Sequence, residues 1–511
     1  MTRKATGKMV VGEILANAAI RHPERESYFC TSTRRRFTFR QTDERCNRLA
    51  NGLGGLGLRK GERVAFLSSN RAEMVEIYFA LAKTGLIGLP LNYRLAPQEM
   101  LELMRAVGAS ALLLERRFAA ALAPLLADLP EVSRIVSFGE GEAPGSDYEE
   151  LLAASAASAP AIEIEEEDPF YFNLTSGTTG LPKCYLINHY NCTAGTSLFN
   201  GYDMTARDVA MTVFPMFGRV GFGWALQSAS MGIRNVLVNF DGEAVLRLIE
   251  EEGVTITNLV PTMAAMLLAA PNIDTANTAS LRAIVFAGAA LPEPIRQATL
   301  AKLCANLYEY YGMQESGALV LSTPEDRERK PGSVGRPILH SQVRIVDLQG
   351  NDLPPGQPGE ILGRCPAAVT AYYENPEKSA ETFRDGWVHT GDIGYLDAES
   401  YLFISGRLKE VIVTGGQNVH AAEVEELILG FPGVADCSVI GLPDPLWGEA
   451  VTAVVVPAGA AIDGEALIGH CRAHLAGFKT PKRVLQQDDP LPRTPTGKVQ
   501  KFRLVERYSA K

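Results

Sequence analysis

Cysteine and histidine are scarce in this sequence. Its 511 residues include eight cysteines and seven histidines, and no two cysteines form a CxxC pair. Scattered thiols of this kind predict neither a zinc site nor a disulfide framework. They are typical of reduced cysteines, so we expect a cytoplasmic protein.

Long apolar runs are absent as well. The apolar stretch 118–127 is ten residues long and contains Pro124, whereas a membrane-spanning helix needs about 18 or more apolar residues. The first twenty residues carry Glu13 inside their apolar part and show no pattern of an export signal. We therefore expect no stable insertion into a membrane.

The sequence also lacks an excess of positive charge. Lysine and arginine number 49 against 59 aspartates and glutamates, which gives a net charge of −10. This balance argues against a general nucleic-acid-binding surface. The composition, 46% hydrophobic and 21% charged, is that of a globular protein. At about 100–200 residues per domain, the length predicts two or more domains.

Amphipathic helical patterns and short apolar runs alternate along most of the chain, which is typical of α/β proteins. In the first part we predict helices at 10–19, 41–54, 72–83 and 97–107, and strands at 63–67 and 111–114. Asn70 precedes the third of these helices in the position of an N-cap. Further on we predict strands at 170–172, 235–239, 255–260 and 283–287, and helices at 243–252, 261–270 and 292–304.

The character of the sequence changes between residues 330 and 405. Short strands at 343–347, 359–363 and 401–404 lie among glycine and proline turns, which predicts a small antiparallel or barrel-like unit. A final unit is predicted to begin near residue 407, because residues 1–406 carry the whole net charge of −10.

The most specific motif is a glycine- and threonine-rich segment directly after the predicted strand 170–172. Small residues let the backbone approach a phosphate closely, and hydroxyls and amides can donate to its oxygens. The segment is not a Walker A loop, because Cys184 follows its lysine. The residues predicted to bind phosphate are Thr175, Ser176, Gly177, Thr178, Thr179, Gly180 and Lys183.

This segment resembles the phosphate-binding signature of the adenylate-forming superfamily, which includes acyl- and aryl-CoA synthetases, standalone adenylation domains and luciferase-like enzymes. Further segments resemble motifs of that family in the same order, so the resemblance covers about residues 35 to 503. These segments are Ala287-Gly288-Ala289-Ala290, Tyr310-Tyr311-Gly312-Met313-Gln314-Glu315, Thr390-Gly391-Asp392, Gly406-Arg407-Leu408-Lys409, Gly415-Gly416-Gln417-Asn418-Val419 and Pro495-Thr496-Gly497-Lys498.

The resemblance implies how ATP is bound and activated. Glu315 would hold Mg²⁺, which prefers carboxylate and phosphate oxygens. Lys498 would bridge the acid's carboxylate and the α-phosphate as a compact positive charge, and Thr178 would act beside them in the loop. The remaining nucleotide-binding residues implied are Gly288, Ala289, Tyr310, Tyr311, Gly312 and Gln314 around the adenine and phosphates, and Asp392 and Arg407 at the ribose.

The resemblance also implies a second half-reaction in the same pocket. The thiol of coenzyme A would attack the acyl-adenylate after the C-terminal unit rotates about Lys409. Gly415 and Gly416 would then let the pantetheine chain pass, because a glycine pair presents no side chains.

The activity implied is that of an AMP-forming acid–CoA ligase, with ATP, Mg²⁺, coenzyme A and a small-molecule carboxylic acid as its partners. The fold implied is a large N-terminal domain of α/β sheets with a small β-barrel-like subdomain, residues 1–406, and a smaller mobile α+β C-terminal domain, residues 407–511. Two alternatives stay open: a standalone adenylation enzyme that loads the phosphopantetheine of a carrier protein, and a non-catalytic nucleotide-binding relative. A homodimer is also left open.

Three positions differ from the commonest pattern of the family. Cys184 follows the loop lysine where glycine is usual, and Gln314 precedes the glutamate where threonine is usual. Gly218 stands beside the expected acyl pocket where an aromatic residue or histidine is common. A glutamine amide can still donate to a phosphate oxygen, so we expect the chain to retain activity.

The acid pocket is predicted around residues 214–224. The main candidates are Phe217, Gly218, Arg219 and Trp224, with further apolar walls at Phe214, Val220, Phe222 and the helix 263–268. This lining favours a medium-chain, alicyclic or aryl carboxylic acid. Arg219 has two interpretations: it faces solvent or pairs within the protein, or it binds a second carboxylate of the acid.

Overall fold

The computed structural model describes residues 7–175, 183–415, 417–493 and 499–509. The chain forms two compact units, which are described separately. Unit 1 comprises Met1–Glu328, Pro337–Gln342 and Arg364–Val388, and unit 2 comprises Arg329–Arg336, Val343–Gly363 and His389–Lys511. The predicted α/β fold is confirmed. The domain boundary predicted at residue 407 stays a prediction.

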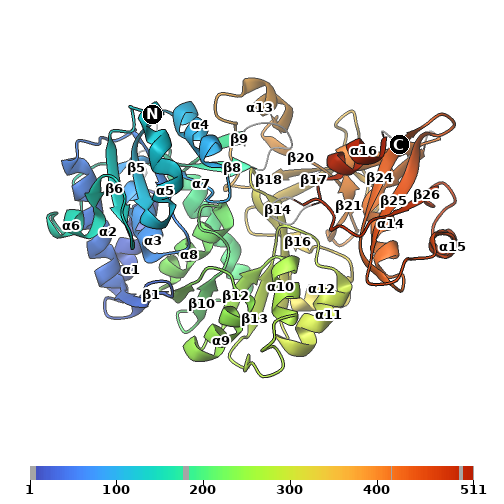
Figure 1. Ribbon diagram of the computed structural model, residues 1–511, viewed down its shortest axis with the longest axis horizontal. Helices are drawn as coiled ribbons and strands as arrows, with labels where there is room; N and C mark the ends of the chain where they lie inside the picture. The colour runs from blue at the N-terminus through green and yellow to red at the C-terminus, as the bar shows by residue number, and fades with distance from the viewer. Residues whose placement is uncertain (1–6, 176–182, 416, 494–498, 510–511) are drawn as a thin grey trace. The chain divides into compact units, whose positions relative to one another are not determined.

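Unit 1 is built on two mostly parallel sheets (Figure 1). In the seven-stranded sheet only β8 and β9 pair antiparallel. Its strands, in spatial order, are β7 (Ser146–Asp147), β6 (Arg134–Phe138), β5 (Ala109–Glu115), β3 (Arg63–Leu67), β4 (Ile87–Pro90), β8 (Pro169–Thr175) and β9 (Lys183–Asn188).

The nine-stranded sheet has a parallel centre, with antiparallel strands β2 and β15 towards its edges. Its strands, in spatial order, are β16 (Arg336–Pro337), β15 (Gly317–Ser322), β14 (Leu307–Met313), β13 (Ala283–Phe286), β12 (Ile256–Leu259), β10 (Val209–Thr212), β11 (Arg234–Leu237), β1 (Glu26–Cys30) and β2 (Arg35–Thr38). Parallel strands need long crossover connections, and helices supply most of them here.

The helices predicted from amphipathic periodicity are confirmed to within about three residues at each end. Figure 1 shows α9, α10 and α11 grouped beside β12 and β13. The helices of unit 1 are α1 (Val11–Arg21), α2 (Phe39–Gly55), α3 (Ala72–Thr84), α4 (Pro97–Val107), α5 (Ala119–Leu122), α6 (Tyr148–Ala153), α7 (His189–Ala194), α8 (Arg219–Met231), α9 (Gly242–Glu252), α10 (Pro261–Leu268), α11 (Glu293–Lys302) and α13 (Pro376–Thr382), and α12 (Pro324–Arg329) extends one residue into unit 2.

Helix α3 is buried along its whole length and forms the centre of unit 1. A helix that is apolar on all sides packs inside a protein, and the charged residues it contains then need partners. Glu76 is 2.6 Å from Nε of Arg45, and Lys83 is 2.6 Å from Asp43. Its charged side chains are thus neutralised within the core.

The segment after β3 joins the two sheets of unit 1. Asn70 was predicted to cap α3, but the N-cap is Arg71, and Asn70 is buried with its side chain bonded elsewhere. Its amide nitrogen donates to Phe214 O at 2.9 Å and Val238 O at 3.0 Å, and its oxygen accepts from Met216 N at 2.8 Å. A local pattern could not predict these tertiary partners.

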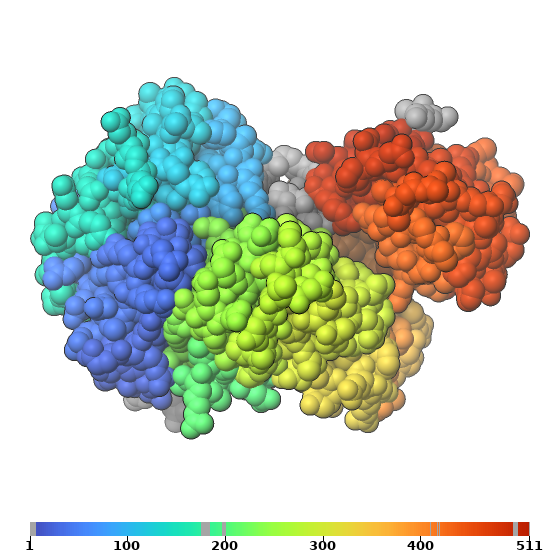
Figure 2. Space-filling view, turned by 60° about the horizontal axis from the view of Figure 1, so that its bottom comes forward, coloured from blue at the N-terminus to red at the C-terminus, as the bar shows by residue number. Residues whose placement is uncertain are grey.

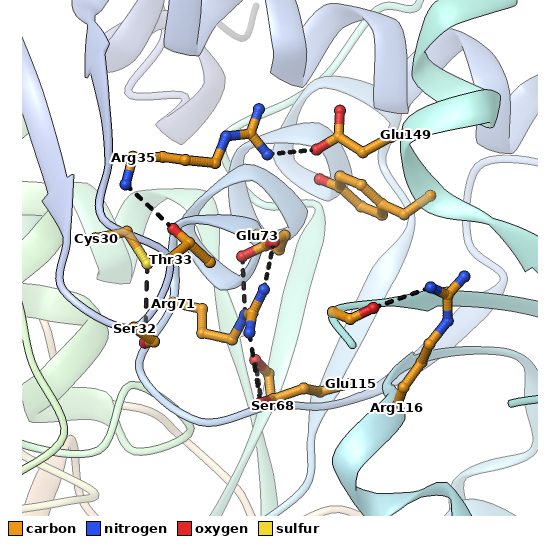
Figure 3. Close-up of polar contacts among 12 residues, drawn as sticks. Cys30, Ser32, Thr33, Arg35, Ser68, Arg71, Glu73, Glu115, Arg116 and Glu149 are labelled. Carbon is orange, nitrogen blue, oxygen red and sulfur yellow. Dashed lines mark hydrogen bonds and ion pairs between the residues drawn. The ribbon is translucent and has the colours of Figure 1, made fainter. Parts of the chain in front are cut away.

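The neighbouring charges are paired around the same segment. Figure 3 shows Arg71 between Glu73 and Glu115. The Arg71 guanidinium donates to both oxygens of Glu73, at 2.8 and 3.1 Å, while Glu115 accepts from the Ser69 backbone and hydroxyl at 2.8 Å each. In Figure 2 the surfaces of the two halves of unit 1, blue to cyan and green to yellow, adjoin each other.

Unit 2 contains most of a five-stranded sheet and a second sheet with three helices. The strands predicted at 343–347, 359–363 and 401–404 are confirmed in the first sheet, with shifts of up to three residues. That sheet consists of β17 (Gln342–Val346), β18 (Gly359–Arg364), β20 (Trp387–Leu396), β19 (Phe383–Arg384) and, paired with β20, β21 (Leu402–Arg407). Within the described residues, no helix has both the length and the apolar character needed to cross a bilayer.

The second sheet of unit 2 packs against α14 and α16. Its strands are β23 (Gln417–His420), β22 (Val411–Thr414), β25 (Gly448–Pro457), β24 (Val434–Asp444) and, paired with β25, β26 (Arg483–Gln486). The helices are α14 (Ala421–Leu429), α15 (Gly464–His474) and α16 (Lys501–Ser509).

The hydrogen bonds of Asn70 lead to a prediction about the stability of the fold. Asn70→Ala should lower the free energy of unfolding by about 3 kcal/mol, because it leaves three backbone groups of the sheet junction without partners. The measurement is the urea midpoint and slope of unfolding. Asn51→Ala is the matched control, since Asn51 also bonds two carbonyls, Ala156 O and Ser158 O, but in a more exposed position. Equal losses in both variants would contradict the interpretation.

Candidate functional site

The predicted phosphate loop connects two paired strands of unit 1. Strands β8 and β9 are antiparallel, with Thr175 opposite Lys183 and Leu174 opposite Cys184. Both ends of the loop are therefore fixed side by side in the sheet. The loop residues Ser176, Gly177, Thr178, Thr179 and Gly180 lie outside the described residues.

Cys184, one of the departures from the family pattern, is half-buried beside this loop. Its carbonyl accepts from Tyr373 N at 2.8 Å. Burial raises the pKa of its thiol to about 12, so the thiol stays protonated and is a poor nucleophile near neutral pH. The structure thus gives Cys184 a packing role.

The residues Gln314, Glu315 and Ser316 form the turn between β14 and β15, which we call the 314–316 turn. Met313 N donates to the Ser316 hydroxyl at 3.0 Å and so closes the turn. Gly312 has no room for a Cβ atom, because the backbone of Gly317 and Ala318 approaches it too closely. A glycine is thus required where the two strands enter this turn.

Glu315, the predicted Mg²⁺ ligand, is 6% exposed. One carboxylate oxygen accepts from the Tyr372 hydroxyl at 2.7 Å, and its carbonyl accepts from Val369 N at 2.9 Å. Burial raises the pKa of the Tyr372 phenol, so this hydroxyl remains a donor at physiological pH. The second carboxylate oxygen has no partner within the ranges that the structure describes.

Gln314 links the turn to the base of the phosphate loop. Its carbonyl accepts from the Tyr185 hydroxyl at 2.8 Å, and its side-chain oxygen accepts from the Asn173 amide at 2.9 Å. Asn173 lies on β8 and Tyr185 on β9, two residues from either end of the loop. The strands that flank the predicted phosphate loop are therefore bonded to the turn that contains the predicted metal ligand.

The predicted adenine-binding residues lie at the carboxyl ends of neighbouring strands. Gly288, with a φ of 83°, and Ala289 are exposed in the turn after β13. Tyr310, Tyr311 and Gly312 lie on β14, which pairs in parallel with β13. Ligands of open α/β sheets bind at this end of the strands. Adenine binding by these residues stays a prediction.

The predicted acid-binding residues divide between an open position and the core. Gly218 caps the N-terminus of α8, and the nearest atom to a Cβ added there is Pro215 O at 3.6 Å, so space remains beside it. Phe217 is half-buried and makes an edge contact with Tyr93. Trp224 is buried with Tyr202 and Tyr308.

Phe222 was predicted to line the acid pocket, and this is wrong. Its side chain is fully buried and stacks on Tyr78 at a ring distance of 3.8 Å. The Tyr78 hydroxyl in turn donates to Met216 O at 2.8 Å. The face of α8 that carries Phe222 packs against α3, which the apolar composition of 214–224 could not reveal.

Arg219 lies at the first position of α8 and is half-buried. Its guanidinium donates through one terminal nitrogen to Gln314 O and through the other to Ala367 O. No carboxylate pairs with it among the residues that the structure describes. It therefore pairs within the protein, but with backbone carbonyls.

The predicted ribose-binding residues meet in unit 2. Asp392 on β20 and Arg407 on β21 are opposite each other in the ladder, with Arg407 Nε 3.1 Å from the Asp392 carboxylate. Thr390, two residues earlier on β20, donates to Ile361 O at 2.7 Å and accepts from Asp392 N at 3.0 Å. The carboxylate is thus presented in a defined place.

The predicted hinge and glycine pair also lie in unit 2. Lys409 is in the short 3₁₀ turn Leu408–Glu410. Gly415 has a φ of 55°, and its N–H donates to Trp447 O at 2.7 Å at the end of the hairpin β22–β23. Gly416 lies outside the described residues, as does Lys498.

Both flanks of the loop that contains Lys498 are described and held in place. Arg493 and Val499 form a bridge across its base, and Gln500 N donates to Pro492 O at 2.7 Å. Lys501 then pairs with Glu425 at 2.8 Å and with Glu410 at 3.1 Å. The described residue Lys501, which follows the loop, is therefore tied to Glu410 beside the predicted hinge.

Several residues of these networks were not predicted from the sequence. Tyr372, Asn173 and Tyr185 hold the 314–316 turn, and Lys501 anchors the lysine loop. The only feature of the sequence that could have indicated Asn173 and Tyr185 is their position, because they flank the glycine-rich segment symmetrically. Tyr372 carries no such signal, because it approaches Glu315 from 57 residues away.

Comparisons with known proteins identify the family of this chain. The chain matches the AMP-binding enzyme family over residues 15–373 and the AMP-binding enzyme C-terminal domain over residues 423–498. A feruloyl-CoA synthase of Amycolatopsis sp is 36% identical over 477 residues, covering 92% of this chain and 94% of that protein. A fatty acid–[acyl-carrier-protein] ligase of Streptomyces coeruleorubidus is 33% identical over 486 residues, covering 93% of this chain and 92% of that protein.

Among solved structures, ATP-bound MatB from Rhodopseudomonas palustris is similar over 98% of this chain and 99% of its own, with a TM-score of 0.88 and 29% identity. The sequence match covers well over half of the chain, and the fold agrees over nearly all of it. The chain belongs to the AMP-binding enzyme family.

Proposed function

We propose that this protein is an AMP-forming acid–CoA ligase. In the first half-reaction, a carboxylate oxygen of the acid attacks the α-phosphorus of ATP, and pyrophosphate leaves as the bond to the β-phosphate oxygen breaks. In the second, the thiol of CoA loses its proton and attacks the acyl carbon. A C–S bond forms, the C–O bond to the phosphate breaks, and AMP leaves.

The observation that carries this proposal is the hydrogen bonding between the two strands that flank the predicted phosphate loop, β8 and β9, and the 314–316 turn. Asn173 and Tyr185, beside the two ends of the loop, both bond to Gln314. A backbone suited to phosphate and a buried carboxylate suited to a hard cation are thus neighbours. Such an arrangement orients a triphosphate and balances its charge, which is the main demand of phosphoryl chemistry.

Glu315 fits Mg²⁺ by the chemistry of its carboxylate. One oxygen is fixed by Tyr372, and the other has no partner in the described part of the chain. When bound, Mg²⁺ would neutralise part of the phosphate charge. The protein's own contribution is to hold the carboxylate in place, and Tyr372 does this with a hydroxyl that stays protonated.

The other proposed roles follow the expectations from the sequence. Asp392 would accept from the ribose hydroxyls, with Arg407 beside it. Lys498 would stabilise the negative charge that develops at the α-phosphate. Gly415, and Gly416 after it, would let the pantetheine chain pass because they carry no side chains. The Trp447 ring packs against Gly415, where an added Cβ would lie 3.0 Å from it.

For the acid, we propose a medium-chain, alicyclic or aryl carboxylic acid. The space beside Gly218 and the half-buried ring of Phe217 support an apolar pocket. The relatives include enzymes for an aryl and for an aliphatic acid, since one is a feruloyl-CoA synthase and another a fatty acid–[acyl-carrier-protein] ligase. Each buried methylene should contribute about 0.8 kcal/mol.

A second candidate concerns the thiol acceptor. The fatty acid–[acyl-carrier-protein] ligase of Streptomyces coeruleorubidus covers 93% of this chain, so a carrier-protein phosphopantetheine is a specific alternative to CoA. The acid-dependent exchange of pyrophosphate into ATP tests adenylation with a panel of acids. Product formation with CoA or with a loaded carrier protein then separates the two acceptors. No exchange with any acid would favour a non-catalytic nucleotide-binding protein.

Lys498→Ala should lower adenylation by about 10²–10³-fold while ATP still binds, because its charge is needed mainly in the transition state. Pyrophosphate exchange gives the rate, and calorimetric titration gives ATP affinity. Arg503→Ala, which removes a cation from the neighbouring helix α16, is the control and should keep near-normal activity. Normal exchange by the Lys498 variant would refute the assignment.

Lys501→Met should lower adenylation about tenfold, because the lysine loop would lose its anchor to Glu410 and Glu425. Lys501→Arg keeps the charge and should retain activity within about threefold. Pyrophosphate exchange at saturating ATP compares the two variants. If both lost the same activity, the ion pairs would have no role in positioning the loop.

Gly218→Leu should reduce kcat/KM for aryl and medium-chain acids by about tenfold or more, with a smaller effect on acetate and propionate. The φ of −98° at Gly218 suits any residue, so the added side chain should fill space without strain. Competition between acids at a fixed ATP concentration measures the change. Gly54→Leu, at a similarly open position on α2, is the control for the added bulk.

A further inference from the structure

The environment of Arg219 points to a role that the sequence did not predict. Gly218 and Gln314 are two of the three positions that differ from the commonest family pattern, and Arg219, which follows Gly218, bonds to Gln314 in the fold. Arg219 comes from the start of α8, whereas Gln314 belongs to the turn between β14 and β15. The contact joins the wall of the proposed acid pocket to the turn that carries Glu315.

The guanidinium bridges two backbone carbonyls. One terminal nitrogen donates to Gln314 O and the other to Ala367 O, so each terminal nitrogen has a backbone acceptor. Gly317 makes room for this arrangement, since a Cβ there would lie 3.3 Å from a terminal nitrogen of Arg219, and its φ of 71° suits glycine. The site is built around the arginine.

Both carbonyls belong to segments that contact Glu315. The segment 365–372 holds the 314–316 turn through Val369 N to Glu315 O at 2.9 Å and through the Tyr372 hydroxyl to the carboxylate at 2.7 Å. A third contact is that of the Cys365 thiol, which donates to Ser316 O at 2.9 Å, and Arg219 ties the segment to the turn at a fourth point. On the opposite side, Tyr185 donates to the same Gln314 carbonyl at 2.8 Å.

We propose that Arg219 is a positioning residue for adenylation: its guanidinium holds the 314–316 turn against the segment 365–372 and thereby fixes the Glu315 carboxylate. This rests on the proposed function for its activity readout, but not for its structural one. It differs from binding a second carboxylate of the acid, because the acceptors of the two terminal nitrogens are backbone carbonyls of the protein. An arginine suits this bridge because the two terminal nitrogens of its rigid, planar fork are held at a fixed separation, whereas a lysine offers a single nitrogen on a flexible stem.

The activity test compares Arg219→Ala, Arg219→Lys and Arg219→Met with the wild type. Arg219→Ala should lower kcat for pyrophosphate exchange by about 10–100-fold, equally for a monoacid and its matched diacid, since displacement of a positioned group by about 1 Å can cost 10² in rate. Thioester formation from a supplied acyl-adenylate and CoA should change less than about threefold. Millimolar guanidinium should restore part of the exchange rate in Arg219→Ala but not in Arg219→Met, whose side chain fills the space.

Arg134→Ala is the matched control. Arg134 is also half-buried in unit 1 and donates to one backbone carbonyl, Leu56 O at 2.9 Å, but on β6. It should leave exchange unchanged, with or without guanidinium. Loss of exchange with the diacid alone in Arg219→Ala would overturn the proposal in favour of substrate binding, and equal loss in both half-reactions would reduce Arg219 to a stability role.

A structural test separates this proposal from the proposed function. Hydrogen exchange of the Val369 amide, which donates to Glu315 O, should become at least about tenfold faster in Arg219→Ala and stay unchanged in Arg134→Ala. Unchanged protection of Val369 in Arg219→Ala would overturn the positioning role. Absence of exchange activity in the wild type would instead refute the ligase function, while the hydrogen-exchange result would still decide on Arg219.

Discussion

The carbonyl oxygen of Gln314 is the point on which the proposed active site depends. A carbonyl can accept two hydrogen bonds, and here the Tyr185 hydroxyl and the Arg219 guanidinium supply them. The donors come from β9 and α8, so one atom fixes the turn relative to both the phosphate loop and the acid-binding side. Glu315 follows in the chain and takes its place from this constraint. Tyr372 then only has to orient its carboxylate.

Buried charges are compensated in different ways in the core of unit 1 and in the proposed active site. In α3, charged residues meet opposite charges, as with Glu76 beside Arg45 and Lys83 beside Asp43. Such pairs cancel and leave little field outside the core. Arg219 is satisfied by carbonyl dipoles, which stabilise a cation without neutralising it. A net positive charge thus remains near a site proposed to bind a carboxylate and a triphosphate, where it favours anions.

The elements and the order of the motifs could be predicted from the sequence, because helix and strand periodicity and the glycine-rich segment are local features. The errors came from tertiary contacts. Asn70 has the pattern of an N-cap but bonds across the sheet junction, and Phe222 has the pattern of a pocket wall but stacks on Tyr78. The sequence left two interpretations of Arg219 open for the same reason. Its carbonyl partners lie 95 and 148 residues away. Every residue has a backbone carbonyl, so the sequence cannot indicate which carbonyls the guanidinium binds.

The contacts within unit 2 indicate which backbone bonds would turn if the C-terminal part rotated about Lys409. Before this residue, the ladder between β20 and β21 holds Arg407 opposite Asp392. After it, Glu410 is held by Lys501, which also anchors the loop of Lys498. Leu408, 40% exposed, lies between these two tied segments. A change of backbone angle there would move the lysine loop together with Glu410 as one piece, because their ion pair lies entirely on the same side of the predicted hinge.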